Sequence, residues 1–592
     1  MPRKGWQRPS GGRDEDKELV TKLCYLTDTT QKTIQIISLI ASDLKRGDNP
    51  TLILAPLSVM SNWSGQIEAH VKPDNPLRVH TYHGSKKHGQ TPADFQQYDV
   101  VVTTYDTMSQ EFWAGAAGGK TPRSVPRDKG LFSLEWRRIV LDEGHQIRNP
   151  KSKRAVAACA LTARSRWVLT GTPIVNTLDD LYSLVKFLRL RGGLEQKDVF
   201  HGTLLRPLKQ GKEEAAILLK ALMSTICLRR LKSFEWINLK LPALTSHKYP
   251  IDFLREEKQR YDAFATEAKG ILIAFQTRKE QTGNNTYSHL LEVLLRMRQC
   301  CNHWKLAGED RVSRLLEILQ ENKKLELNDE NKKQLQDLLQ LAIDQQEECP
   351  VCYEVLHDPK ITACGHPFGG SCIERVIETQ HKCPMCRAAL QSKDELVDPR
   401  PECSGDDAAA SGIDTDTSSS KLEALLNILK ASGKKPGTKT VIFSQWTSCL
   451  DIVQRKLTDN SITWCRLDGS MKPQDRDAAI DSLNKNPNCS VMLASLAVCS
   501  VGLNLCAANQ VILLDSWWSP AIEDQAVDRV HRLGQTREVT VFRLVMKDSI
   551  EERVLDIQAG KRKLMMQAFG DKSMKRGNEK ATRLADIQKL LA

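Results

Sequence analysis

The sequence predicts an α/β protein with two lobes, each a parallel sheet covered by helices, together with a helical insertion and a small zinc-binding module. Short β-rich apolar runs alternate with helical stretches in two separate regions, and leucines recur at helical spacing between them. Six of the 17 cysteines fall close together after the leucine-rich stretch. The 592 residues are enough for about four domains.

The expected strands form two groups. The first group is 51–55, 100–104, 138–141 and 167–170, and the second is 440–444, 463–467, 491–494, 511–515 and 539–544. Between them, residues 256–343 carry leucines at helical spacing among many Glu and Lys residues. Two α/β lobes separated by helices follow from this order.

The expected boundaries follow the changes in composition. Residues 393–419 are rich in small, acidic and Ser residues and are predicted to be a flexible linker, so the zinc-binding module is expected to be tethered rather than fused. The predicted parts are a disordered N-terminus (1–20), the first lobe (21–250), the helical insertion (251–345), the zinc-binding module (346–392), the linker (393–419), the second lobe (420–570) and a C-terminal tail (571–592).

The charge balance favours a polyanionic partner. Lys and Arg number 85 against 73 Asp and Glu, which gives a net charge of +12. No apolar run reaches the roughly 18 residues that span a bilayer, and no apolar segment follows the basic start, so we expect neither a membrane nor a secreted protein. Clustered cysteines indicate metal binding in a reducing compartment.

Two adjacent carboxylates follow an apolar strand. Asp142 and Glu143 come directly after the run 138–141, and open α/β sheets bind ligands at the carboxyl ends of their strands. Phosphoryl transfer needs one acid to hold Mg²⁺ and another group to orient the attacking water. We assign Asp142 the first role and Glu143 the second. The alternative is an exposed acidic turn.

Two arginines near the end of the second lobe are candidates for neutralising charge in the transition state. Arg529 and Arg532 are three residues apart, so on a helix both project to one side and can face a bound triphosphate. The alternative is a solvated helix face. The acidic pair and the second sheet in the same chain favour the catalytic interpretation.

With these residues in place, the sequence resembles the Swi/Snf-type ATPases of helicase superfamily 2. The matching segments are ILAPLSVMSNW (53–63), LDEGHQIRNP (141–150), LTGTPIVNTLDDLYSLVKFL (169–188), LRR (228–230), VIFSQW (441–446), RLDGSM (466–471), SVGLNL (500–505) and WWSPAIEDQAVDRVHRLGQ (517–535). They occur in the family order over most of residues 30–560.

The resemblance implies two RecA-like lobes that bind double-stranded DNA, and ATP with Mg²⁺, between them. It also implies that the protein translocates on DNA without necessarily separating the strands. It assigns ATP binding to Lys32, Thr33, Gln525 and Gly502. It assigns DNA contacts to the segment Thr103-Thr104-Tyr105, to Ser444 and Gln445, and to the turn Gly469-Ser470.

The phosphate-binding loop departs from the family pattern. The family's two glycines would fall at Thr29 and Gln31, and Asp28 adds a negative charge, although Lys32 and Thr33 are in place. Two explanations compete: hydrolysis is impaired, or the first segment was truncated or misjoined when the coding sequence was assembled. We favour the second because the other motifs are intact. The alternative function is an ATPase-impaired, DNA-bound scaffold or ubiquitin ligase.

The cysteine cluster has the ligand spacing of zinc sites. It consists of Cys349, Cys352, Cys364, His366, Cys372, Cys383 and Cys386. It resembles a RING finger, which implies one zinc held by Cys364, His366, Cys383 and Cys386 and a second held by the remaining three cysteines. The family's fourth cysteine of this second set would fall at Gly369, which leaves three thiolates there.

RING fingers bind ubiquitin-conjugating enzymes through an apolar patch, and the resemblance maps this contact to Val351, Pro384 and Arg387. The alternative is a purely structural zinc knot. A RING between two ATPase lobes narrows the resemblance to the RING-bearing, helicase-like ATPases of post-replication repair. It implies a nuclear DNA translocase or remodeller with ubiquitin-ligase activity in DNA repair or chromatin, and chromatin or replication-clamp proteins as further partners.

Overall fold

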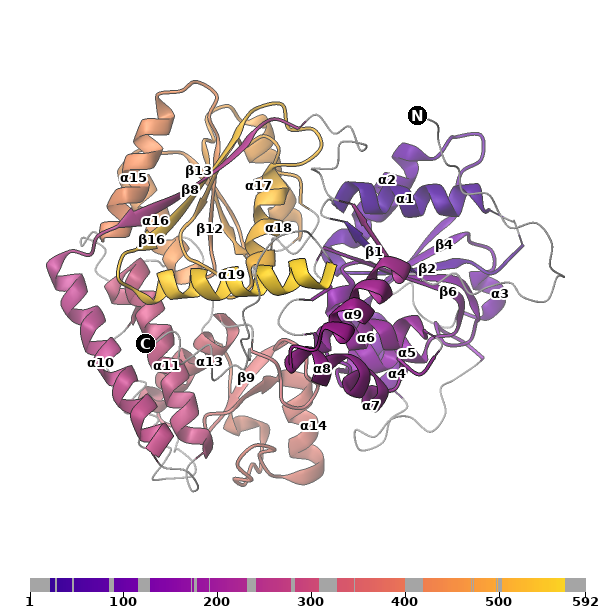
Figure 1. The fold of residues 1–592 in the computed structure, drawn as a ribbon, viewed down its shortest axis with the longest axis horizontal. Helices are drawn as coiled ribbons and strands as arrows, with labels where there is room; N and C mark the ends of the chain where they lie inside the picture. Colours follow the sequence, from indigo (N-terminus) through magenta and orange to yellow (C-terminus); the bar gives the residue numbers. More distant parts are fainter. Residues whose placement is uncertain are drawn as a thin grey trace.

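The protein is described here from a computed structural model (Figure 1). The structure describes residues 22–26, 29–44, 47–84, 90–114, 128–171, 173–174, 178–190, 192–230, 241–277, 283–307, 327–344, 347–399, 419–469, 471, 473–496, 498 and 503–569. The predicted disordered N-terminus and C-terminal tail lie outside these residues, as do 400–418 of the predicted linker.

In the described part of the first lobe, seven strands form one sheet with the order β3-β4-β2-β5-β6-β1-β7. The strands are β1 (Lys22–Leu26), β2 (Thr51–Ala55), β3 (Val79–Tyr82), β4 (Val100–Thr104), β5 (Trp136–Leu141), β6 (Ala163–Thr170) and β7 (Cys227–Arg230). Their pairings are parallel. Every residue of β2 and β4 is buried, as expected for strands covered on both faces.

Helices cover both faces of this sheet. Two of them, α1 (Thr29–Ser42) and α2 (Leu57–His70), share a core with Ile53 and Val140, whereas α4 (Tyr105–Trp113), α5 (Lys153–Ala160), α6 (Asp179–Leu188) and α9 (Glu213–Ile226) pack on the opposite side. The shorter elements are α3 (Pro92–Phe95), η3 (Gly144–Ile147), α7 (Lys197–Phe200), η4 (His201–Leu205) and α8 (Arg206–Lys209). Alternation of side chains along the strands accounts for the two cores.

The second lobe repeats this plan. Its six described strands have the order β13-β14-β12-β15-β16-β8 and pair in parallel. They are β8 (Leu244–Ile251), β12 (Thr440–Ser444), β13 (Trp464–Leu467), β14 (Val491–Ser495), β15 (Gln510–Leu513) and β16 (Val539–Met546). The helices are α15 (Ser420–Gly433), α16 (Thr447–Asp459), α17 (Pro473–Lys485), α18 (Pro520–Val530) and α19 (Ile550–Phe569). The last of these runs back to pack against α9 of the first lobe (Figure 1).

The boundary predicted at residue 250 is wrong for the last strand. Strand β8 pairs with β16 from Leu244 to Ile251 and therefore belongs to the second sheet. The hydrogen bonds between β8 and β16 join two segments that lie almost 300 residues apart in the sequence. The hydrophobic pattern alone does not reveal such a pairing.

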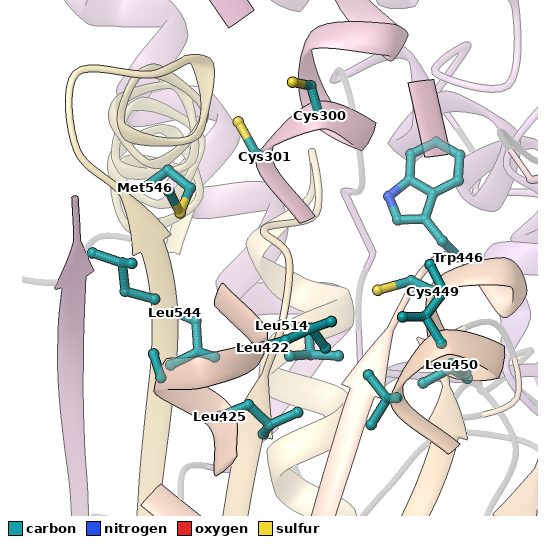
Figure 2. Packing of buried hydrophobic residues seen from close by; sticks show 14 of the residues in the cluster. Cys300, Cys301, Leu422, Leu425, Trp446, Cys449, Leu450, Leu514, Leu544 and Met546 are labelled. Carbon is teal, nitrogen blue, oxygen red and sulfur yellow. The ribbon is translucent and has the colours of Figure 1, made fainter. Parts of the chain in front are cut away.

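The predicted helical insertion contains α10 (Arg255–Thr277), α11 (Gly283–Asn302), η6 (Trp304–Ala307) and α13 (Asp329–Asp344). Helices α10 and α11 share a hydrophobic core with α15, α16 and α19. Figure 2 shows Cys300 and Cys301 of α11 in the same buried cluster as the second-lobe residues Met546, Leu422 and Cys449. These two helices therefore form a layer of the second lobe. Residues 308–326 of the predicted insertion lie outside the described chain.

The cysteine module contains β9 (Pro359–Thr362), β10 (Pro367–Gly369), α14 (Gly370–Gln380), η7 (Lys393–Glu395) and β11 (Leu396–Val397). Strand β11 pairs antiparallel with β9, so residues 393–397, which we predicted to lie in a flexible linker, complete the small sheet instead. Among the described residues, no helix is both long and apolar enough to cross a bilayer.

Candidate nucleotide site and zinc centres

Asp142 lies at the carboxyl end of β5, where the strand leaves the centre of the first sheet. Its backbone N–H donates to the carbonyl of Leu54 at 2.8 Å. One carboxylate oxygen accepts from Trp63 Nε1 at 2.8 Å, and the other accepts from the backbone N–H of Glu143 at 3.0 Å. The Tyr105 hydroxyl donates to the Asp142 carbonyl at 2.7 Å. The carboxylate is thus fixed in place and 8% exposed.

Glu143 adopts the left-handed region, with φ 48° and ψ 52°, which is a strained conformation for a residue with a side chain. Its Oε2 is buried, accepts no hydrogen bond and lies 3.4 Å from His145 Nδ1. Gly144 is required next in the chain because a Cβ there would lie 2.3 Å from Val168 Cγ1. The turn therefore directs an uncommitted carboxylate oxygen into the site.

The electrostatics of this turn favour the binding of a positively charged ligand over an ion pair between the turn's own residues. Burial and the Glu143 charge raise the pKa of Asp142 to about 6, against the opposing effects of the Trp63 hydrogen bond and the Lys32 charge. Burial, with the charges of Arg148 and Lys32, lowers the pKa of His145 to about 3, so its imidazole is neutral. A divalent cation at this position would relieve the repulsion between the two acids.

Lys32 and Thr33 lie in the first turns of α1 and are buried, with exposed fractions of 3% and 8%. Because the helix begins at Thr29, its unpaired N–H groups come from the predicted phosphate loop, and such groups bind anions. The N–H groups at the start of α1, the Lys32 ammonium and the two acids together fit a nucleoside triphosphate with Mg²⁺. Residues 27–28 and the side chains of Thr29 and Gln31 lie outside the description.

The two predicted arginines are arranged differently from our expectation. Arg529 lies on α18, which ends at Val530, so Arg532 lies beyond the helix. The prediction that the two arginines share one face of a helix was therefore wrong. Arg532 Nη1 donates to the Leu503 carbonyl at 2.6 Å, and both side chains are buried within the lobe. Gln525 is half-buried on α18, and Gly502 lies outside the described residues.

The residues assigned to DNA contact lie at strand ends with their hydroxyls turned inward. Thr103 Oγ1 donates to the Tyr82 carbonyl at 2.7 Å, and the Thr104 side chain caps α4. Ser444 Oγ donates to Asp515 at 2.5 Å, and the Gln445 backbone N–H donates to the same carboxylate at 3.1 Å. Trp63 and Asp515 had no predicted role, and Tyr105 was predicted only as part of the DNA-contacting segment 103–105; all three lie in or beside the motifs.

The cysteine module brings its predicted ligands into two groups. Ligand atoms of Cys364, His366, Cys383 and Cys386 lie within 4.8 Å of one another, as do the thiols of Cys349, Cys352 and Cys372. Each Cys-x-x-Cys turn is followed by a residue with positive φ, Tyr353 (57°) and Arg387 (63°). Each turn is closed by a backbone hydrogen bond back to its first cysteine, at 2.8 Å and 2.9 Å. This paired geometry fits two tetrahedral zinc ions.

The two groups differ in completeness. Gly369 lies beside the three-thiol group, and a Cβ there would lie 3.9 Å from Cys349 Sγ and 3.2 Å from the His357 carbonyl. No His, Asp or Glu of the described chain joins the three thiols. Three thiolates leave one position of a tetrahedral zinc site without a ligand from the described chain.

The predicted contact surface for a conjugating enzyme is partly open. Pro384 and Arg387 are exposed on the second Cys-x-x-Cys turn, Met385 between them is 50% exposed, and Val351 on the first turn is half-buried.

The module is docked on the first lobe, which corrects the expectation that it is only tethered. Arg148 Nη2 lies 3.2 Å from Glu348 Oε1, and the Arg154 backbone N–H donates to Glu354 Oε1 at 2.8 Å. Arg154 also donates to Gln146 and Asp106 of the first lobe, so its guanidinium joins the segment after Glu143 to the module. Sequence pattern offers no signal for such a contact.

The fold defines a two-lobed α/β protein with an inserted cysteine-rich module, and family comparisons agree. The SNF2-related domain matches residues 27–306, the helicase conserved C-terminal domain 420–534, and the zinc finger, C3HC4 type (RING finger) 348–386. The chain therefore contains an SNF2-related domain and a helicase conserved C-terminal domain with a RING finger between them, as predicted.

Several curated proteins are similar over nearly the whole chain. Helicase-like transcription factor of Oryctolagus cuniculus is 35% identical over 99% of this chain and 58% of its own length. A putative SWI/SNF-related matrix-associated actin-dependent regulator of chromatin subfamily A member 3-like 1 of Arabidopsis thaliana is 34% identical, covering 100% and 63%. DNA repair protein RAD5A of the same plant is 33% identical, covering 90% and 52%. The chain thus spans between half and two thirds of the length of these relatives.

Among solved structures, the Sulfolobus solfataricus SWI2/SNF2 ATPase core in complex with dsDNA is 24% identical over 93% of this chain and 89% of that chain. The TM-score of 0.33 is too low for a comparison of lobe arrangement.

Proposed function

We propose that this chain is a DNA-dependent ATPase that translocates on double-stranded DNA and carries ubiquitin-ligase activity through its RING. The buried Asp142–Glu143 turn carries the ATPase half of the proposal, because a strained glutamate there keeps one oxygen without a hydrogen bond. The SNF2-related and helicase C-terminal domains, and relatives named for DNA repair and chromatin regulation, support it.

In this proposal Lys32 and Thr33 hold the phosphates of ATP, and Asp142 holds Mg²⁺, which neutralises phosphate charge. Glu143 Oε2 accepts a hydrogen bond from the attacking water and orients it. Arg529, Arg532 and Gln525 act from the second lobe on the same phosphates. The strand ends that meet DNA are shaped by Thr103, Thr104, Ser444 and Gln445. The buried hydroxyls of the first three fix the local backbone. Nuclear localisation follows from a chromatin or DNA repair role.

DNA-stimulated ATP hydrolysis by the full chain tests the first half. We expect hydrolysis that duplex DNA stimulates and that Lys32→Ala reduces by about a hundredfold, because the buried ammonium no longer meets the phosphates. Lys45→Ala, in the same region of the sequence, is a charge-matched control. Absence of hydrolysis in the unaltered chain would contradict this proposal.

The second candidate, an ATPase-impaired scaffold, is favoured by Thr29 and Gln31 in place of the family glycines. If the unaltered chain is inert and Thr29→Gly with Gln31→Gly restores hydrolysis, the altered loop is the cause. Retained DNA binding without hydrolysis in both proteins would favour the scaffold.

The ligase half is carried by the exposed Pro384 and Arg387 beside complete ligands for one zinc. Autoubiquitination with a panel of conjugating enzymes should fall at least about tenfold in Val351→Ala and Arg387→Ala, since hot-spot contacts dominate such small interfaces. Lys393→Ala, an exposed change on the same module, is the control. Products that do not depend on Val351 or Arg387 would count against a RING-mediated reaction.

A further inference from the structure

The three-thiol group of the RING lies against the first ATPase lobe, at the start of α5. The backbone N–H of Lys153 donates to the Cys352 carbonyl at 3.3 Å, and that of Arg154 donates to Glu354 at 2.8 Å. The next N–H, that of Ala155, donates to Ser152 Oγ at 3.1 Å. The first N–H groups of a helix have no partner within the helix. Here the RING supplies acceptors for two of them.

The Lys153 side chain reaches the thiols themselves. Its Nζ lies 3.7 Å from Cys372 Sγ, within hydrogen-bonding distance for sulfur, and the side chain is half-buried between the two domains. The positive end of the α5 dipole points the same way, because Lys153 is the first residue of the helix. Both features favour negative charge on the cysteines.

The charge of the zinc site explains why this contact matters. Zinc with three thiolates carries one net negative charge, and a buried net charge is costly unless a counter-charge lies beside it. The Cys364 group contains a neutral histidine with three thiolates and includes an exposed cysteine, so water can solvate its charge. Cys349, Cys352 and Cys372 are all buried.

We propose that Lys153 of the ATPase lobe supports the three-thiol zinc site of the RING: it donates to the Cys372 thiolate and neutralises the negative charge of a site that Gly369 leaves with three cysteines. Zinc binding at this site and docking of the RING on α5 then stabilise each other. The site is thus shared between two domains, and this inference rests on zinc binding by the RING but not on its ligase activity.

The test is zinc retention by the full chain. Zinc content is measured by elemental analysis, and zinc release to excess 4-(2-pyridylazo)resorcinol is followed in time. We expect two zinc ions per unaltered chain, and release from one of them about tenfold faster in Lys153→Met, the loss typical of a removed partner of a metal ligand. Lys153→Arg should retain most zinc because it keeps the charge and the donor. Lys151→Met, an exposed neighbour, is the control.

Gly369→Cys provides the decisive comparison. A fourth thiolate raises the net charge of the zinc site from one to two negative charges, so the Lys153 counter-charge is still needed and release should again be about tenfold faster in Lys153→Met in the Gly369→Cys background. Lys153→Arg, which keeps the charge, shows whether the Lys153→Met variant had merely misfolded. Equal release from Lys153→Met and the unaltered chain, or a loss that disappears with Cys at position 369, would overturn the proposal. One zinc per unaltered chain would overturn it too, while leaving the ATPase proposal untouched.

Discussion

The two ATPase lobes place an acidic residue at the same position of the sheet and use it differently. Asp142 N–H donates to the Leu54 carbonyl at 2.8 Å, and Leu514 N–H donates to the Phe443 carbonyl at 3.0 Å. The two contacts are equivalent, because the first joins β2 to β5 within the order β4-β2-β5-β6 and the second joins β12 to β15 within the order β14-β12-β15-β16. By this register Glu143 of the first lobe corresponds to Asp515 of the second.

The surroundings of the two carboxylates are opposite. Glu143 Oε2 accepts no hydrogen bond. Asp515 accepts from Ser444 Oγ at 2.5 Å, from the Gln445 N–H at 3.1 Å and from Asn302 Nδ2 at 3.4 Å. Asn302 ends α11, so the Asp515 carboxylate fastens the helical layer to the second lobe. One position of the same fold therefore leaves a carboxylate oxygen without a hydrogen bond in one lobe and forms a structural anchor in the other.

Charge around Asp515 supports the structural role. Burial raises its pKa, while the Ser444 hydrogen bond and the charges of Arg298 and Lys421 oppose the rise. Lys421 itself is paired with Glu551 at 2.6 Å, with both side chains almost fully buried. A repeated fold therefore does not imply a repeated function, because neighbouring side chains decide whether an acid is available.

The largest effect expected from this comparison is on catalysis in the first lobe. Glu143→Gln should reduce DNA-stimulated ATP turnover by about a hundredfold or more, because a neutral amide is a far weaker base and acceptor for the attacking water than a carboxylate. The melting temperature should stay unchanged, since Glu143 Oε2 makes no hydrogen bond that the fold would lose. Turnover above about a tenth of the unaltered rate would contradict the assigned role.

In the second lobe the matching change should act on stability. Asp515→Ala leaves Ser444, Gln445 and Asn302 without their acceptor beside the buried Arg298, so the free energy of unfolding should fall by about 3 kcal/mol. Urea unfolding followed by circular dichroism measures it. Asp459→Ala, an exposed change on the same lobe, should be neutral. An Asp515→Ala protein as stable as the unaltered chain would contradict the structural role of Asp515, and with it the proposed difference between the two lobes.

The first lobe should be the acid-sensitive one. Burial lowers the pKa of His145 to about 3, whereas an unfolded histidine titrates near the ordinary 6.5. The unfolded chain therefore binds one more proton at His145 between these values, so this group alone should lower stability by about 1 kcal/mol for each pH unit below 6.5, whereas the raised pKa of Asp142 acts in the opposite direction below about 6. Melting temperatures at pH 7.0 and 5.5 should differ less in His145→Gln than in the unaltered chain. Equal slopes would show that His145 titrates normally.

The smallest effect concerns one hydrogen bond of the anchor. Ser444→Ala should cost about 1 kcal/mol in urea unfolding, because Asp515 keeps its two other donors. DNA affinity should change less than about twofold at fixed salt, because the hydroxyl is buried and occupied. A large loss of DNA affinity without a loss of stability would assign Ser444 a direct contact instead.

The strand segments were predictable because a buried parallel strand must be a short run of β-branched and apolar residues. All nine predicted runs overlap observed strands, and the acidic pair follows β5 as expected. The edge strands β3, β7 and β8 and the internal strand β1 of the lobes were missed. Strand β8 is largely exposed, with only Ile251 buried, so its hydrophobic pattern is weak. The position of Arg532 was missed because the helix ends one residue after Arg529.

By itself the sequence determined the order of the lobes, the ligands of both cysteine groups and the acidic pair, because these depend on local spacing and on motifs that are continuous in the chain. Only the tertiary structure decided that α11 belongs to the second lobe, that Asp515 is an anchor and that Lys153 reaches Cys372. Those contacts join residues that are distant in the chain, and hydrophobic periodicity reports which face of an element is buried but not its partner.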